Sequence, residues 1–245
     1  MVLVASGRFD RTADPATGRA AIAYLGPHPR ASGTIWPQGT PQLFRVESDP
    51  DSEPIATHFH PIDQFQLIVG GTGWLASHPV GIGSLHYADA YRPYGPIEAG
   101  RDGLAFLTLR ATVDFGAYYM PASRNLLREK AGRQASTPRR RNITVDLLAA
   151  ADEPAARHGW HPALHKPDGL QVLVVELGAN VAAPPVQVGG AGGYLAVLSG
   201  AVTVGRHHIG AGGAAFIHAD ELLDDVVAHQ RLGSVISLMQ FPATT

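Results

Sequence analysis

The sequence predicts an all-β protein in which two β-domains, each a sandwich or a barrel, follow one another along the chain. Three observations predict this fold class. Short apolar runs alternate with turns, and the 28 Gly and 19 Pro residues that mark those turns are spread along all 245 residues. Helical patterns are few. The two halves of the chain also share an order of segments, as a weak internal duplication would produce.

Each expected element has its own local signal. Apolar runs of strand length, bounded by turn residues, predict β-strands at 41–48, 64–71, 104–113, 170–177, 194–205 and 234–241. Helical spacing followed by a terminal Gly predicts a helix within 121–132, and a second short helix is expected within 143–159.

The duplication places a domain boundary near the middle of the chain. "QLIVGGTGWLAS" in the first half matches "YLAVLSGAVTVG" in the second, and each is followed by a Gly-rich connection and a further strand. Between them, residues 121–142 carry seven basic residues and one acidic residue. We interpret 128–142 as a solvated basic linker, with an N-terminal domain over 1–127 and a C-terminal domain over 143–245.

Composition excludes several classes of function. The chain has no Cys, so disulfides, thiolate metal ligands and a Cys nucleophile are excluded. The net charge of −2 favours neither nucleic acid nor an anionic surface as partner. The N-terminus lacks the features of a secretory signal, and no apolar run reaches membrane-spanning length. We therefore expect a cytoplasmic protein with neither nucleic-acid nor membrane partners.

The stretch "THFHPIDQFQLIVGG" (57–71) carries the strongest functional signal. Side chains alternate along a strand, so His58 and His60 share one face, and two imidazoles at this spacing can converge on one divalent ion. Gln64 and Gln66 share a face of the next strand. If the strands are neighbours, a glutamine reaches the space between the histidines.

The spacing His58-x-His60-x3-Gln64-x6-Gly71 resembles the first sequence motif of the cupin family, and "YADAYRPYGPIEAG" (87–100) is similar to the second. This resemblance is clear over about residues 40–115. It implies a double-stranded, jelly-roll β-barrel with a metal ion inside, and two such barrels in tandem, a bicupin. Glu98 stands at the position of the second motif's histidine, and Gln64 stands where the first motif has a glutamate. The implied metal ligands are therefore His58, His60, Gln64 and Glu98.

Two imidazoles and a carboxylate suit one divalent ion: Fe(II), Mn(II) or Zn(II). A metal-free barrel with a polar pocket is the alternative interpretation. The second half has Gln187, Gly189, Gly193 and Leu223 at the corresponding positions, so the C-terminal barrel is expected to be degenerate and structural.

These observations together predict a metal-dependent enzyme that acts on a small organic molecule, with dioxygenase chemistry slightly favoured over isomerase, lyase or cyclase chemistry. The expected catalytic residues are Gln66, His86 as an acid or base, and Tyr94 at the pocket. A homodimer is the expected assembly. The alternative function is a small-molecule binding or sensing bicupin that holds no metal.

Overall fold

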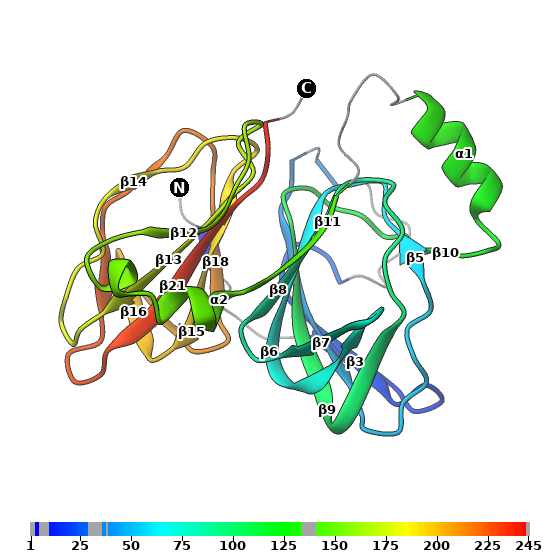
Figure 1. Cartoon of the computed structure of the whole chain (residues 1–245), viewed down its shortest axis with the longest axis horizontal. Coiled ribbons are helices and arrows are strands. Elements are labelled where there is room, and N and C mark those ends of the chain that lie inside the picture. Colours follow the sequence, from blue (N-terminus) through cyan, green and yellow to red (C-terminus); the bar gives the residue numbers. More distant parts are fainter. Residues whose placement is uncertain (1–2, 5–9, 29–35, 38, 134–140, 244–245) are drawn as a thin grey trace. The chain divides into compact units, whose positions relative to one another are not determined.

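The computed structural model describes residues 3–4, 10–28, 36–37, 39–133 and 141–243. The chain divides into two compact units, one formed by residues 8–144 and the other by residues 145–245 together with residues 1–7. Both units are built almost entirely from β-strands (Figure 1). No helix among the described residues is long and apolar enough to cross a membrane.

The N-terminal unit holds one large sheet, with strand order β11-β8-β6-β9-β4-β3-β2, and β7 pairs with β6 outside that order. A two-stranded sheet of β5 and β10 completes the unit, and Figure 1 shows this pair with α1 beyond it. The elements are β2 (Asp10–Asp14), β3 (Arg19–Leu25), β4 (Gln42–Ser48), β5 (His58–Phe59), β6 (Gln64–Leu75), β7 (His78–Gly81), β8 (Ser84–Ala88), β9 (Ile97–Arg110), β10 (Tyr118–Tyr119), α1 (Arg124–Arg133) and β11 (Asn142–Asp146).

The long strands β6 and β9 form the centre of this unit. Their pairing shifts register between Ile68 and Gly70 and again between Gly71 and Gly73. Such bulges bend a strand and increase its twist, which lets a single sheet curl around a core. Gly71 has φ +69, and a Cβ there would collide with the carbonyl of Gly103. The predicted motif glycine is therefore required by the bend.

The C-terminal unit has a six-stranded sheet in the order β1-β18-β15-β21-β13-β12, with smaller sheets β14-β19 and β17-β16-β20. Its elements are β1 (Leu3–Val4), α2 (Leu147–Ala151), the short helix η1 (Pro154–Arg157), β12 (His161–His165), β13 (Gln171–Leu177), β14 (Val186–Gln187), β15 (Gly193–Ser199), β16 (Ala201–Val204), β17 (His207–Gly210), β18 (Ala214–Ile217), β19 (Leu222–Leu223), β20 (Val226–Ala228) and β21 (Ser234–Gln240).

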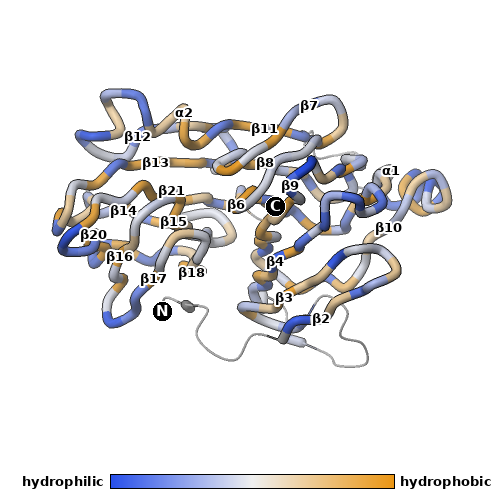
Figure 2. The backbone as a smooth tube through the Cα atoms, turned by 90° about the horizontal axis from the view of Figure 1, so that it is seen from below, coloured by the Kyte–Doolittle hydropathy of each residue, from blue (hydrophilic) through white to orange (hydrophobic). Residues whose placement is uncertain are grey.

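The core of the C-terminal unit is built around a large apolar cluster. It is a single cluster of Val, Leu, Ile and Ala side chains that includes Leu195, Ile236 and Leu223. Figure 2 shows the hydrophobic stretches of β13 and β21, which are hydrogen-bonded neighbours. The buried polar side chains of this unit, Ser234, Ser237 and Gln240, each donate to a backbone carbonyl.

The predicted boundaries differ from these units at three places. Residues 3–4 were assigned to the N-terminal domain but pair with β18 of the C-terminal unit. Part of the predicted linker is the end of helix α1, and residues 134–140 lie outside the described residues. Arg141, predicted to be solvated, instead binds the buried carboxylate of Asp89 through its backbone N–H and its guanidinium.

Candidate functional site in the N-terminal barrel

Strand pairing sets the polar side chains of the site in rows across the inner face of the sheet. Phe44, Thr108, Gln66 and His86 lie directly opposite one another on β4, β9, β6 and β8. Residues two positions along a strand share its face. Gln42, Arg110 and Gln64 therefore form the next row, and all three are buried.

Arg110 connects this second row. Its side chain is only 3% exposed, and it donates to Oε1 of Gln64 over 3.0 Å and to Oε1 of Gln42 over 2.9 Å. The guanidinium also donates to the carbonyl of Asp114 over 2.8 Å and lies over the Phe44 ring. A guanidinium only donates, so the bond from Arg110 fixes which end of the Gln64 amide is oxygen.

His60 is held between a carboxylate and this guanidinium. Nδ1 of His60 lies 2.5 Å from Oδ2 of Asp114, and Nη2 of Arg110 lies 3.1 and 3.3 Å from the two ring nitrogens. Burial lowers the pKa of His60 and outweighs the bond to Asp114, which raises it. Burial disfavours the charged Asp114 carboxyl, yet the His60 hydrogen bond and the Arg110 charge together hold its pKa below the usual value.

In His58, unlike His60, only one ring nitrogen has a hydrogen-bond partner among the described residues. Its Nδ1 lies 2.7 Å from the carbonyl oxygen of Ala56. Since a carbonyl only accepts, Nδ1 carries the proton of the neutral ring. Burial lowers the pKa of His58 to about 4, so Nε2 is unprotonated near neutral pH. The His58 and His60 rings are 5.3 Å apart, edge to face.

Tyr94 joins the two glutamines. Its hydroxyl oxygen accepts from Nε2 of Gln64 over 2.5 Å and from Nε2 of Gln66 over 3.3 Å, and its ring lies 4.5 Å from that of His58. Burial raises the pKa of the Tyr94 hydroxyl, which therefore keeps its proton.

His86 lies behind this group. Its Nδ1 is 3.0 Å from the hydroxyl of Thr144, and burial lowers its pKa to about 4. Nε2 of His86 and Oε1 of Gln66 are both buried without a hydrogen-bond partner among the described residues. Unsatisfied buried polar atoms are rare, and such atoms indicate a ligand or a water at the site.

The structure brings together six of the seven predicted site residues: His58, His60, Gln64, Gln66, His86 and Tyr94. Glu98 is the exception, because the structure places it away from the other six. On β9 it follows Ile97, which belongs to the buried core cluster, so the alternation of the strand turns Glu98 outward, where it is exposed opposite Trp74.

The predicted metal centre does not fit the residues that are present. Both ring nitrogens of His60 are engaged by Asp114 and Arg110, and Oε1 of Gln64 is engaged by Arg110. The described residues contain no group of three His, Cys, Asp or Glu able to hold a metal ion. A guanidinium charge beside the histidines also opposes a divalent cation. Only Nε2 of His58 remains from the predicted ligand set.

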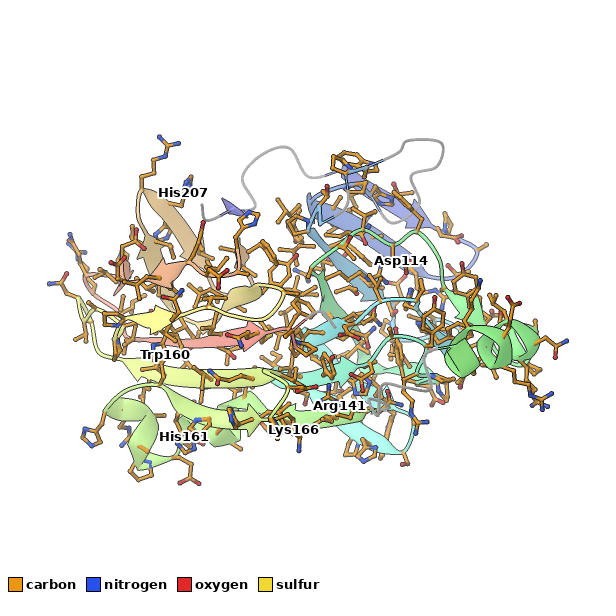
Figure 3. The ribbon with its side chains drawn as sticks, turned by 90° about the horizontal axis from the view of Figure 1, so that it is seen from above. Asp114, Arg141, Trp160, His161, Lys166 and His207 are labelled. Carbon is orange, nitrogen blue, oxygen red and sulfur yellow. The ribbon has the colours of Figure 1, made fainter. Side chains whose placement is uncertain are left out.

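A cavity of about 370 Å³ opens onto these residues. Buried polar side chains line part of it, among them His58, His60, Gln66, Tyr94, Arg110 and Asp114. Apolar side chains line it as well, and these are Ala21, Phe44, Val46, Ile55, Ile97 and Phe106. Asp14, Thr17 and Arg19 also belong to the lining. The loop after β9, which carries Asp114 (labelled in Figure 3), also supplies Phe115 and Tyr119 at the cavity's exposed side. His86 does not line the cavity.

Sequence reasoning missed Gln42, Arg110 and Asp114. The available signal was Arg110 itself, a single charge within the otherwise apolar run 104–113 that was predicted as a strand. A charged residue at a buried strand position needs partners, and here the partners come from β4, β6 and the following loop.

Comparisons with known proteins agree on the fold. No family model matches the chain, and no curated protein matches it. Among solved structures, an oxalate decarboxylase matches 100% of this chain and 78% of its own, at 12% identity and a TM-score of 0.63. A putative dioxygenase from Nostoc punctiforme matches 98% of this chain and 78% of its own, at 12% identity and a TM-score of 0.60.

The matches also include a protein of another kind. An 11S globulin from Wrightia tinctoria, whose structure reveals an auxin binding site, matches 99% of this chain and 83% of its own, at 11% identity and a TM-score of 0.62. Identities this low show the fold alone. The chain therefore has the bicupin fold, with two cupin barrels in tandem, and this fold is shared by enzymes and by globulins.

Proposed function

We propose that the N-terminal barrel binds a small organic molecule inside its cavity, through protein side chains and without a metal ion held by the predicted ligands. The observation that carries this proposal is the cavity of about 370 Å³ whose lining includes a buried, hydrogen-bonded polar group. Ligand sites commonly combine a volume of about 300–1,000 Å³, apolar walls and a few placed polar groups.

The Arg110 network supports a preorganised site. Gln42, Gln64, Asp114 and His60 are fixed by bonds to one buried guanidinium. Side chains that are already held in place lose little conformational entropy when a ligand binds. Gln66 lines the cavity, and its Oε1 has no hydrogen-bond partner among the described residues.

The metal-dependent enzyme that the sequence predicted has weaker support. The fold is shared with an oxalate decarboxylase and a putative dioxygenase, but fold does not fix function. The predicted ligand Glu98 faces outward, and His60 and Gln64 are engaged within the protein. The dioxygenase prediction therefore lacks the two-histidine, one-carboxylate set on which it rested.

The test is to identify what the purified protein carries. Denaturing extraction followed by mass spectrometry is expected to release a small organic molecule from the wild type. Ala21→Phe, which places a ring in the cavity, should abolish it. Ala13→Phe, at an exposed position on the neighbouring strand β2, is the matched control and should retain it. Equal recovery from both variants would contradict the cavity as the binding site.

Elemental analysis of protein purified without chelators provides an independent check. No transition metal is expected in stoichiometric amount, and EDTA treatment should leave the thermal unfolding midpoint unchanged. A stoichiometric metal that disappears in His58→Ala would reject this proposal and return the metal-dependent enzyme as the better explanation.

A further inference from the structure

The cavity presents a hydrogen-bond acceptor at His58. Nδ1 of this ring donates to the carbonyl of Ala56, and an uncharged imidazole has only one N–H. Nε2 therefore carries a lone pair. His58 lines the cavity, and no group of the described residues donates to Nε2. A ligand that pairs with this nitrogen must supply a proton.

Gln66 and Tyr94 add complementary groups beside it. Oε1 of Gln66 is a second acceptor without a partner among the described residues. The Tyr94 oxygen accepts from Gln64 and Gln66, so its own proton must point to another acceptor. A hydroxyl group on a ligand has one proton to donate to an acceptor such as Nε2 of His58, and its lone pairs can accept from the Tyr94 hydroxyl.

The charges around the site disfavour an ionised ligand. Arg110 and Asp114 lie 3.8 Å apart and balance each other, and each of the three guanidinium nitrogens already donates to a protein atom. The other two charged residues that line the cavity, Asp14 and Arg19, are also of opposite sign. A ligand carboxylate would face the Asp114 carboxylate and two acceptors. A ligand ammonium would face the Arg110 charge. Burying either ion without a partner is costly.

From these contacts we infer that the barrel's ligand is an uncharged molecule with an apolar body and a hydroxyl group, an alcohol or a phenol. The hydroxyl donates to Nε2 of His58 and accepts from the hydroxyl of Tyr94, while the apolar body packs against Phe44, Ile97 and Phe106. This inference rests on the proposed function, because it requires the cavity to be the binding site.

The test compares three probes that share one bicyclic body: β-naphthol, β-naphthoate and β-naphthylmethylammonium. Isothermal titration calorimetry of the full chain near neutral pH should show β-naphthol binding at least about tenfold more tightly than either charged probe. Tighter binding of β-naphthoate or of the ammonium probe would overturn the inference.

Variants assign the preference to the named atoms. His58→Phe keeps a ring but removes the acceptor, and it should weaken β-naphthol binding about tenfold. Tyr94→Phe removes only the hydroxyl and should weaken it severalfold. His78→Phe, the same change at an exposed position of β7, should leave binding unchanged. Thermal unfolding of each variant verifies that it is folded. If His58→Phe does not fold, the inference is still tested by β-naphthol binding to Tyr94→Phe and by the relative affinities of the three probes for the wild type.

The outcomes also separate this inference from the proposed function. If a charged probe binds best and Ala21→Phe abolishes that binding, the cavity is a binding site and only the ligand class is wrong. A β-naphthol preference that survives both His58→Phe and Tyr94→Phe would also overturn the inference. If no probe binds the wild type, the inference fails, and the co-purified molecule alone decides the proposed function.

Discussion

At the scale of single residues, Arg110 is the side chain on which the interior of the N-terminal barrel depends. Its guanidinium is buried and bonds to groups on β4, on β6 and in the loop after β9. The neighbouring Asp114 carboxylate is also buried. Removing one partner of a buried charged pair leaves the other uncompensated, which costs more than the pair contributes.

Arg110→Met, which preserves much of the side-chain volume, is expected to lower the free energy of unfolding by about 3 kcal/mol, as measured by urea denaturation. Arg110→Lys should also destabilise the barrel, because a single ammonium cannot reproduce the planar set of donors. Adding Asp114→Asn to Arg110→Met should restore part of the loss. Arg92→Met, at an exposed position, is the control. If Arg92→Met and Arg110→Met lowered the free energy of unfolding equally, this role for Arg110 would be refuted.

The sequence predicted part of this site because part of it is local. His58, His60, Gln64 and Gln66 lie within nine residues, and strand alternation alone places them in pairs. Arg110 lies 46 residues from Gln64 and 68 from Gln42, so no local pattern connects them. Glu98 lies apart from the other predicted site residues because motif spacing does not determine which face of β9 a residue occupies. The register with β6, bulges included, decides that.

At the scale of elements, the predicted strands correspond to observed ones where the apolar pattern is strong. Runs 41–48, 64–71, 170–177 and 234–241 match β4, β6, β13 and β21, with β6 extending further. The run 194–205 is two strands instead of one, because Gly200 at φ +73 turns the chain between β15 and β16. The helix expected within 143–159 is divided into α2 and η1, and Pro154 begins η1.

Among the strands that the sequence did not predict, β2 and β3 were missed for a physical reason. β2 has the sequence DRTAD, which is polar and lies at the sheet edge, and β3 is only partly buried. Edge strands are held mainly by backbone pairing with a neighbour, so their side chains need no alternating pattern. The pairing of β2 and β3 with β4 nevertheless matters for function, because Ala21 on β3 forms part of the cavity wall.

The end of the basic segment makes an element-scale prediction. Arg141, which precedes β11, places its guanidinium 3.0 and 3.1 Å from the two oxygens of buried Asp89, just after β8. Arg141→Ala should lower the free energy of unfolding by about 2 kcal/mol, because hydrogen bonds to a buried charge are lost. It should also speed hydrogen exchange along β11. Arg128→Ala, at an exposed position of α1, is the matched control and should change neither quantity. If Arg141 were instead part of a solvated linker, Arg141→Ala and Arg128→Ala would have the same free energy of unfolding and the same hydrogen exchange along β11.

At the scale of the whole molecule, the two units divide stability and chemistry between them. The C-terminal unit has a large apolar core cluster, whereas the described interior of the N-terminal barrel holds a guanidinium, two carboxylates, three histidines and three glutamines. Buried polar groups stabilise a fold only when they are paired. The N-terminal barrel therefore gives up apolar burial to form a site, and its stability should respond to pH more strongly than that of the C-terminal unit.

This difference can be measured through His58 and His86. Burial lowers the pKa of each from 6.5 to about 4, so between these values the unfolded chain binds protons that the folded barrel does not. Stability is therefore complete above pH 6.5 and falls as the pH decreases toward 4. Each histidine contributes roughly 1.4 kcal/mol per pH unit across that window. At still lower pH, protonation of Asp114 removes a further contribution.

Urea denaturation of a Trp160→Phe background, in which the remaining tryptophans Trp36 and Trp74 belong to the N-terminal unit, should report this barrel alone. His86→Gln in that background removes one of the three histidines whose pKa burial lowers, and it should reduce the pH slope of its free energy of unfolding. His207→Gln, on the β17 hairpin of the C-terminal unit, should leave the slope unchanged. An unchanged slope in His86→Gln would mean that the His86 ring is not held neutral by burial. The unpartnered Nε2 in the barrel would then be a protonated donor rather than a lone pair, and the polarity assigned to this part of the interior would be reversed.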